Sequence, residues 1–149
     1  MDTSTGTSSG PIVVGVDESE TSRRAAFTAA ELARALGAPL HLVMSVSRTR
    51  TQAASSSGDQ WSVDWLSTAE QFMDALVGEL RVPQTTRTVS TDDPAAAICD
   101  EAARLHARMI VVGNRRMQGL SRVLGAVATD IARRSPCDVL IAYTKLAID

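Results

Sequence analysis

Short apolar runs alternate with longer helix-like segments along the sequence, and this alternation most narrows the folds open to the chain. Most of the runs are β-branched and lack a polar residue at every second position, which is typical of strands covered on both faces. Five strands are expected, at residues 11–16, 40–46, 85–89, 109–113 and 137–143. The third is polar and β-branched, which predicts an edge strand. The order predicts an α/β fold: a doubly wound, five-stranded parallel sheet of the Rossmann or flavodoxin type, with helices on both faces.

The segments between the strands have helix signals at their ends and an apolar residue every three or four positions. Ser19 and Asp93 are suitable N-caps, Pro94 suits a first helical position, and Gly37 suits a C-cap. The second helix is expected over about 61–80. The expected buried faces consist of Ala25, Ala29, Leu32 and Leu36 in the first helix; Trp65, Ala69, Phe72, Met73, Leu76 and Leu80 in the second; Ala95, Ile98, Ala102 and Leu105 in the third; and Leu124, Val127, Ala128 and Ile131 in the fourth.

Composition divides the chain into a tail and one domain. Residues 1–10 are rich in Ser, Thr and Gly without periodicity and predict a disordered tail, and residues 11–149 predict a single domain. Residues 48–60 are polar, with a Ser-Ser-Ser-Gly stretch, and predict a long loop between the second strand and the second helix.

The charge balance and the cysteine count exclude several classes of protein. The net charge is −2, from 15 basic and 17 acidic side chains, which argues against binding to nucleic acid or anionic lipid through surface charge. No apolar run approaches the roughly 20 residues of a membrane span, and the N-terminus lacks the features of a secretory signal. Cys99 and Cys137 are too few for a disulfide framework, so we expect small buried thiols in a reducing cytoplasm.

A ligand site is expected where the first, second and fourth strands end, because open parallel sheets bind ligands beyond the carboxyl ends of their strands. The loop at residues 113–127 is the most informative, since three glycines and three arginines precede a helix whose N-terminus favours an anion. The loop is neither a Walker loop nor a dinucleotide fingerprint. On this pattern alone, a phosphate site and a simple tight turn are both open interpretations, and so are solvated charges and phosphate contacts for the arginines.

Four segments together resemble the universal stress protein family, in order and at compatible spacing. They are residues 12–19, 93–95, 111–127 and 135–141. The resemblance implies an adenine nucleotide, ATP or another, as ligand, and a homodimer built on the last strand through Val139, Leu140, Ile141 and Tyr143. It implies that Asp17 meets the ribose or, through the bound nucleotide, Mg²⁺. The implied site consists of Gly15, Val16, Asp17, Ser45, Val46, Val112, Gly113, Arg115, Arg116, Gly125, Ala126 and Val127.

The phosphate side departs from the pattern of nucleotide-binding members, which is Gly-x-x-Gly, nine residues, then Gly-Ser or Gly-Thr. Arg116 stands at the second glycine, Ala126 stands where the hydroxyl is expected, and eight residues separate Arg116 from Gly125. Losing one hydroxyl contact costs about 0.5–1.5 kcal/mol, so we expect weaker phosphate binding rather than none.

Three functions from different classes follow. The leading one is a dimeric stress-response domain that responds to an adenine nucleotide. The second is a nucleotide-free module that binds another protein. The third is a slow ATP hydrolase or an autophosphorylating protein, with Ser121 or a nearby hydroxyl as acceptor. No nucleophile elbow, paired acid–base motif or metal-ligand cluster is present in the sequence, so no catalytic residue is expected. His41 and His106 lack partners at motif spacing and are expected to be structural.

Overall fold

The computed structural model describes residues 10–46, 59–114 and 124–144, with the side chains of residues 59–65 excepted. The predicted loop at 48–60 and the predicted tail lie mostly outside these ranges. The strands are β1 (Ile12–Val16), β2 (Leu40–Ser45), β3 (Thr85–Ser90), β4 (Met109–Val112) and β5 (Asp138–Ile141). The helices are α1 (Glu20–Leu36), α3 (Asp59–Leu80), α4 (Pro94–Arg104) and α5 (Ala126–Arg134).

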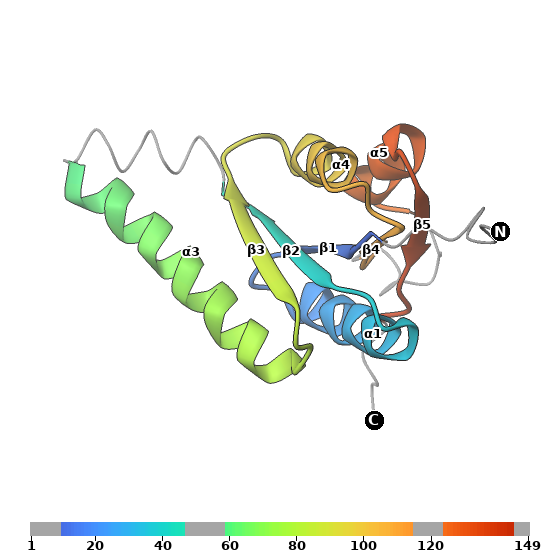
Figure 1. The fold of residues 1–149 in the computed structure, drawn as a ribbon. Helices are drawn as coiled ribbons and strands as arrows, with labels where there is room; N and C mark the ends of the chain where they lie inside the picture. The colour runs from blue at the N-terminus through green and yellow to red at the C-terminus, as the bar shows by residue number, and fades with distance from the viewer. Residues whose placement is uncertain (1–9, 47–58, 115–123, 145–149) are drawn as a thin grey trace, which may run out of the picture.

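The five strands form one parallel sheet in the order β3-β2-β1-β4-β5. Helices α1 and α3 cover one face of the sheet, and α4 and α5 cover the other (Figure 1). The predicted doubly wound α/β fold is therefore confirmed. The polar strand β3 lies at one edge, as its composition predicts, and β5 lies at the other.

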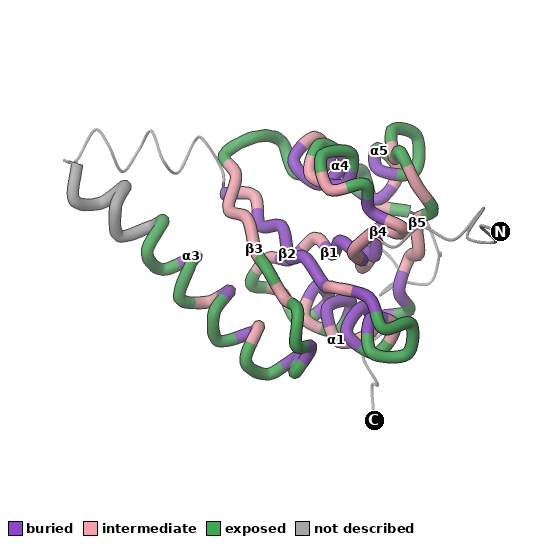
Figure 2. Tube along the Cα trace, in the orientation of Figure 1, coloured by how far each residue is buried: buried purple, intermediate pink, exposed green. Residues whose placement is uncertain are grey.

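The apolar strands are buried because each face of the sheet has its own core. Along β1, Ile12, Val14 and Val16 belong to the core beneath α1 and α3, whereas Val13 belongs to the core beneath α4 and α5. Successive side chains of a strand point to opposite faces, so a strand covered on both sides is apolar throughout. Figure 2 shows buried residues along the central strands and a less buried β3 at the edge.

The predicted helix ends are largely confirmed. The Ser19 hydroxyl accepts a hydrogen bond from the Ser22 N–H at 3.1 Å, and the Asp93 carboxylate accepts one from the Ala96 N–H at 3.2 Å. Gly37 follows α1 with a φ of +63°, a left-handed conformation that favours glycine. Helix α3 begins at Asp59, two residues before its expected start, and β2 ends at Ser45, one residue before its expected end.

Two of the predicted buried faces contain residues that are exposed, and Leu105 of a third lies just after α4 and is only partly buried. Leu36 is 47% exposed, because alanines such as Ala29 and Ala33 occupy the face of α1 that lies on the sheet, and Leu36 lies outside that contact in the last turn. Leu124 is 43% exposed, because α5 begins only at Ala126. Val127 is 41% exposed, because it lies in the first turn of α5 and not in the core.

Helix α3 carries the apolar stripe that its sequence predicts. Ala69, Met73, Leu76 and Leu80 are buried, and Phe72 packs against the same core. The Trp65 side chain lies outside the described part of the chain. Neither α3 nor any other helix in the described ranges combines the length and the hydropathy that crossing a bilayer requires.

Candidate functional site

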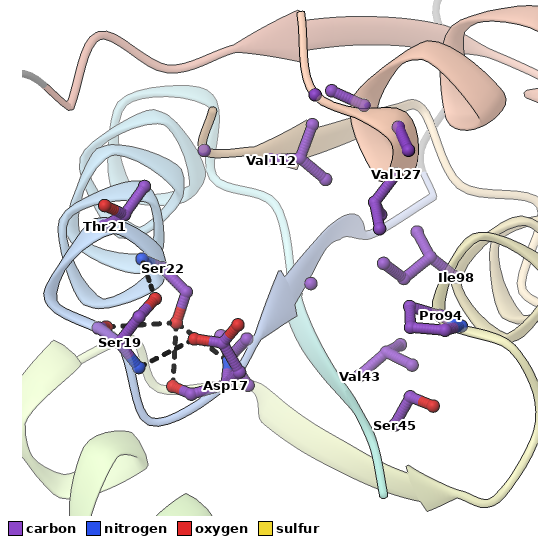
Figure 3. A pocket seen from close by; sticks show the side chains of 16 residues that line it. Asp17, Ser19, Thr21, Ser22, Val43, Ser45, Pro94, Ile98, Val112 and Val127 are labelled. Carbon is purple, nitrogen blue, oxygen red and sulfur yellow. Dashed lines mark hydrogen bonds between the residues drawn. The ribbon is translucent and has the colours of Figure 1, made fainter. Parts of the chain in front are cut away.

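The loops that leave β1 and β4 lie side by side, because these two strands are paired in parallel. The chain continues from β1 to β2 on one side and returns to β4 on the other, so the strand order reverses at this point. A cavity of about 450 Å³ lies at the carboxyl ends of the strands there (Figure 3). Its size falls in the range of small-molecule sites, and its position is where open α/β sheets bind ligands.

Nine of the predicted site residues line this cavity. They are Gly15, Val16, Asp17, Ser45, Val112, Gly113, Gly125, Ala126 and Val127. Val46 does not line it, because the residue is buried in the core beneath α1 and α3. Arg115 and Arg116 lie outside the described residues. The lining residues that sequence reasoning missed are Ser19, Thr21, Ser22, Val43, Pro94, Ile98 and Ala128.

A hydrogen-bonded turn between β1 and α1 holds Asp17 at the cavity. The Asp17 Oδ1 accepts a hydrogen bond from the Ser19 N–H at 2.7 Å, and the Ser22 hydroxyl donates to the Asp17 carbonyl at 2.8 Å. Figure 3 shows Asp17, Ser19 and Ser22 joined by these bonds on one side of the cavity. The carboxylate therefore serves the start of α1 and also presents a fixed acceptor to the cavity.

The opposite side of the cavity is apolar and comes from β2 and α4. Val43, Pro94 and Ile98 lie there, facing the polar turn across the cavity (Figure 3). Gly15 allows Ile98 to reach this position, since a Cβ at residue 15 would lie 2.4 Å from the Ile98 Cδ1. A flat apolar group bound in the cavity would lie between the Asp17 carboxylate and these apolar side chains.

The first turn of α5 completes the cavity. Its N-cap is Gly125, which has no side chain to bond the first amides of the helix. The amides of Ala126, Val127 and Ala128 have no acceptor within the helix, and these three residues line the cavity. The helix dipole adds partial positive charge at the same place. This end of the cavity therefore favours an anion.

The buried Asn114 side chain joins the end of β4 to the start of α5. The side-chain oxygen of Asn114 accepts a hydrogen bond from the Gly125 N–H at 2.8 Å, and the residue is 2% exposed. The sequence holds no local signal for this bond, because its partners are 11 residues apart and the glycine pattern that spans them leaves position 114 unspecified.

The described residues contain no group of three His, Cys, Asp or Glu side chains that could hold a metal ion. Asp17 is the carboxylate among the residues that line the cavity.

A second polar cluster lies away from the cavity, between the sheet and α4. The His41 Nε2 lies 2.9 Å from the Glu101 Oε2, and its Nδ1 lies 2.6 Å from the Thr86 hydroxyl. Glu101 also accepts hydrogen bonds from the Thr88 hydroxyl at 2.9 Å and from the Arg104 guanidinium at 2.8 Å. A neutral ring with its proton on Nε2 satisfies both of its contacts. His41 therefore has a structural role, as expected.

This environment shifts two pKa values in the same direction. Burial lowers the pKa of His41 and outweighs the opposing effect of Glu101. The hydrogen bond from Arg104 is the largest cause that lowers the pKa of Glu101 to about 2. The cluster thus holds an ionised carboxylate against a neutral imidazole.

Both cysteines are free in the structure, but Cys137 is only partly buried and not buried as expected. Cys99 is buried in the core beneath α4 and α5, and burial raises the pKa of its thiol. A thiol that stays protonated is a poor nucleophile, in line with the expected structural role.

Comparison with known proteins identifies similar chains. The model of the universal stress protein family matches residues 9–142. A universal stress protein from Archaeoglobus fulgidus has 25% sequence identity and a TM-score of 0.68, over 89% of this chain and 97% of that one. A structure of a universal stress protein from Archaeoglobus fulgidus in complex with dAMP has 25% identity and a TM-score of 0.66, over 89% of this chain and 96% of that one. A universal stress protein solved in complex with cAMP has 26% identity and a TM-score of 0.68, over 92% and 99%. A search of curated proteins found no match.

Proposed function

The chain belongs to the universal stress protein family, and from that premise we propose that the cavity between β1 and β4 binds an adenine nucleotide. The observation that carries the proposal is the order of chemistry around one cavity: an apolar side, a carboxylate and a helix N-terminus. These match the base, the ribose and the phosphate of a nucleotide. Two of the similar structures were solved with cAMP and with dAMP, which supports the choice of adenine.

The base would lie against the apolar side formed by Val43, Pro94 and Ile98. Adenine has two flat faces that gain from leaving water and an edge that hydrogen-bonds with backbone groups. The end of β2 at Ser45 supplies such groups close by. The Ser45 hydroxyl donates to the Asp92 carbonyl, so that side chain is already engaged and ties the end of β2 to the start of α4.

The ribose would lie beside Asp17. Two neighbouring hydroxyls can donate to the two oxygens of one carboxylate, which no neutral side chain matches. The turn that holds Asp17 at 2.7 Å from the Ser19 N–H restricts the carboxylate before any ligand arrives. A preorganised acceptor loses less conformational freedom on binding, and this favours affinity.

The phosphate would lie at the first turn of α5, where Ala126, Val127 and Ala128 line the cavity and their amides have no acceptor within the helix. Backbone amides and the helix dipole bind a phosphate without any basic side chain. ATP would extend beyond this turn with Mg²⁺ on its phosphates. The absence of a hydroxyl at Ala126 makes us expect AMP to bind at least as well as ATP.

Isothermal titration calorimetry on nucleotide-free protein tests the proposal. AMP, cAMP and ATP are titrated with and without Mg²⁺, with GMP as the control for the base. Heat of binding and a higher Tm are expected for the adenine nucleotides. An absence of both with every adenine nucleotide at millimolar concentration overturns the proposal and leaves the protein-binding module as the alternative.

The Asp17→Asn variant separates the two roles of this carboxylate. Asparagine keeps a side-chain oxygen for the Ser19 N–H, so the start of α1 should stay intact. It removes the charge and one acceptor, so adenosine affinity should fall about tenfold. An Asp17→Asn protein that binds adenosine as well as wild type would show that the ribose lies elsewhere.

The proposal also includes a homodimer in the cytoplasm, where the free thiols of Cys99 and Cys137 would stay reduced. Strand β5 is an edge strand, and its apolar residues are only partly buried in the single chain. Pairing of two copies along β5 would cover them. Nucleotide binding would then shift the population of conformations that this dimer presents to a partner.

A further inference from the structure

Asn114 connects the two ends of the segment that runs from β4 to α5. It follows Gly113 directly, and its side-chain oxygen accepts the Gly125 N–H at 2.8 Å. Gly113 and Gly125 both line the cavity, but Asn114 does not. The bond therefore lies behind the cavity wall and joins two parts of that wall.

Burial makes this bond a strong geometric constraint. Asn114 is 2% exposed, so water competes little for its side-chain oxygen. A hydrogen bond to a buried side chain is stronger than one exposed to water, so losing this bond is costly. The bond therefore holds the first turn of α5 at a fixed distance from the end of β4.

The same bond engages one of the N–H groups at the start of α5 and not the others. Four N–H groups at a helix N-terminus lack acceptors within the helix. Asn114 uses the one on Gly125, the N-cap, and leaves those on Ala126, Val127 and Ala128. These three residues all line the cavity, so the remaining donors belong to the cavity wall.

We propose that Asn114 is a positioning residue for the phosphate group of the ligand. It holds α5 where the amides of the first turn, which have no acceptor within the helix, reach a phosphate attached to a nucleoside in the cavity. The inference rests on the proposed function, since it assumes a nucleoside phosphate in this cavity. The base and ribose sides are built by β1, β2 and α4, which this bond does not hold. Asn114 should therefore matter for the phosphate and not for the nucleoside.

Comparing AMP with adenosine isolates the phosphate. The Asn114→Ala protein should bind AMP about tenfold more weakly than wild type, because α5 loses the bond that fixes its first turn. Its affinity for adenosine should stay within about twofold of wild type. A purely structural role for Asn114 would lower both affinities alike, and that result overturns the assignment.

Thr85→Ala is the matched control. The Thr85 hydroxyl donates to the Val82 carbonyl at 2.6 Å, and Thr85 is the first residue of β3. Its loss also removes one partly buried side-chain-to-backbone bond, but far from the carboxyl ends of the strands. The ratio of AMP to adenosine affinity should stay at its wild-type value in this variant.

Amide NMR on the wild-type protein tests the role of Asn114 even if the Asn114→Ala protein does not fold. Addition of AMP should shift the amide signals of Ala126 and Val127, and the Gly125 amide should stay protected from exchange with solvent. Loss of that protection on AMP binding means that the phosphate displaces Asn114, and the assignment is then wrong. If wild-type protein binds neither AMP nor adenosine, the proposed function and this inference both fail. If wild-type protein binds both and Asn114→Ala lowers both affinities equally, only this inference fails.

Discussion

Gly113 shows how neighbouring residues constrain one position in the cavity. A Cβ added there would lie 2.9 Å from the Thr21 Cγ2 and 3.0 Å from the Thr21 carbonyl oxygen. The methyl group could rotate away, but the carbonyl belongs to the backbone of α1 and cannot move alone. The end of β4 and the start of α1 therefore approach as closely as they do because residue 113 is glycine.

The Gly113→Ala variant should lower the free energy of unfolding by about 1–3 kcal/mol, as overpacking against backbone does. Gly78→Ala is the control, because a Cβ at Gly78 in α3 meets nothing within 4 Å. That change should raise the free energy of unfolding by about 0.5–1 kcal/mol. Urea denaturation of the three proteins measures both effects. A Gly113→Ala protein as stable as wild type would contradict the packing described.

For single residues, the sequence predicted which residues lie at the cavity better than it predicted the contacts that they make. Glycine and aspartate at 15, 17 and 113 could be predicted to lie at the cavity, because their places at the carboxyl ends of the expected strands are visible in the sequence. Thr21 and Asn114 could not, because their importance comes from contacts with Gly113 and Gly125 that only folding creates.

Among the elements, α4 is tied to β2 and β3 by the cluster around His41 and Glu101. The histidine comes from β2, the two threonines from β3 and the carboxylate from α4. These partners are up to 60 residues apart, so no spacing in the sequence could indicate them. Element order and type were predictable from local periodicity, whereas this side-chain network was not.

The cluster predicts a loss of stability in acid. Both pKa values are lower in the folded chain than in the unfolded chain, so the unfolded chain binds protons more readily as the pH falls. The His41 contribution is present above its ordinary pKa of 6.5 and is lost as the pH falls below that value. The Glu101 contribution is lost later, between 4.5 and about 2.

Urea denaturation at pH 7 and at pH 5 measures the first of these losses. Wild-type protein should be less stable at pH 5, and His41→Gln should remove most of that difference because glutamine does not titrate. His106→Gln replaces an exposed histidine outside the cluster and should keep the wild-type difference. Equal pH dependence in all three proteins would show that His41 does not carry it.

For the whole molecule, the proposed dimer gives the clearest prediction. Tyr143 follows β5 and is 61% exposed, so a change there should leave the single chain folded. Tyr143→Lys should weaken dimerisation about tenfold or more, through lost apolar contact and repulsion between copies. Leu36→Lys is the control, since Leu36 is an exposed apolar residue on α1. Sedimentation equilibrium measures both, and equal effects of the two changes would argue against a dimer through β5.

The architecture and the place of the cavity were predictable, since alternating strands and helices allow few arrangements and the reversal of strand order follows from them. The sequence was a poorer guide to where each buried helix face ends. Leu36, Leu124 and Val127 fit helical periodicity but lie outside the contacts that bury a helix face. Periodicity reports which residues share a face and not how far the neighbouring layer extends along it.

The two edges of the sheet differ in a way that bears on aggregation. On β3 the side chains are mostly hydroxylated, and Arg87 is held by Asp74 of α3 at 2.6 Å, whereas Val139, Leu140 and Ile141 follow one another on β5. A charged and polar rim discourages a further strand from adding to it. If two copies pair along β5 as proposed, the two β3 edges face outward, and their polar and charged side chains would resist the addition of further copies into a fibre.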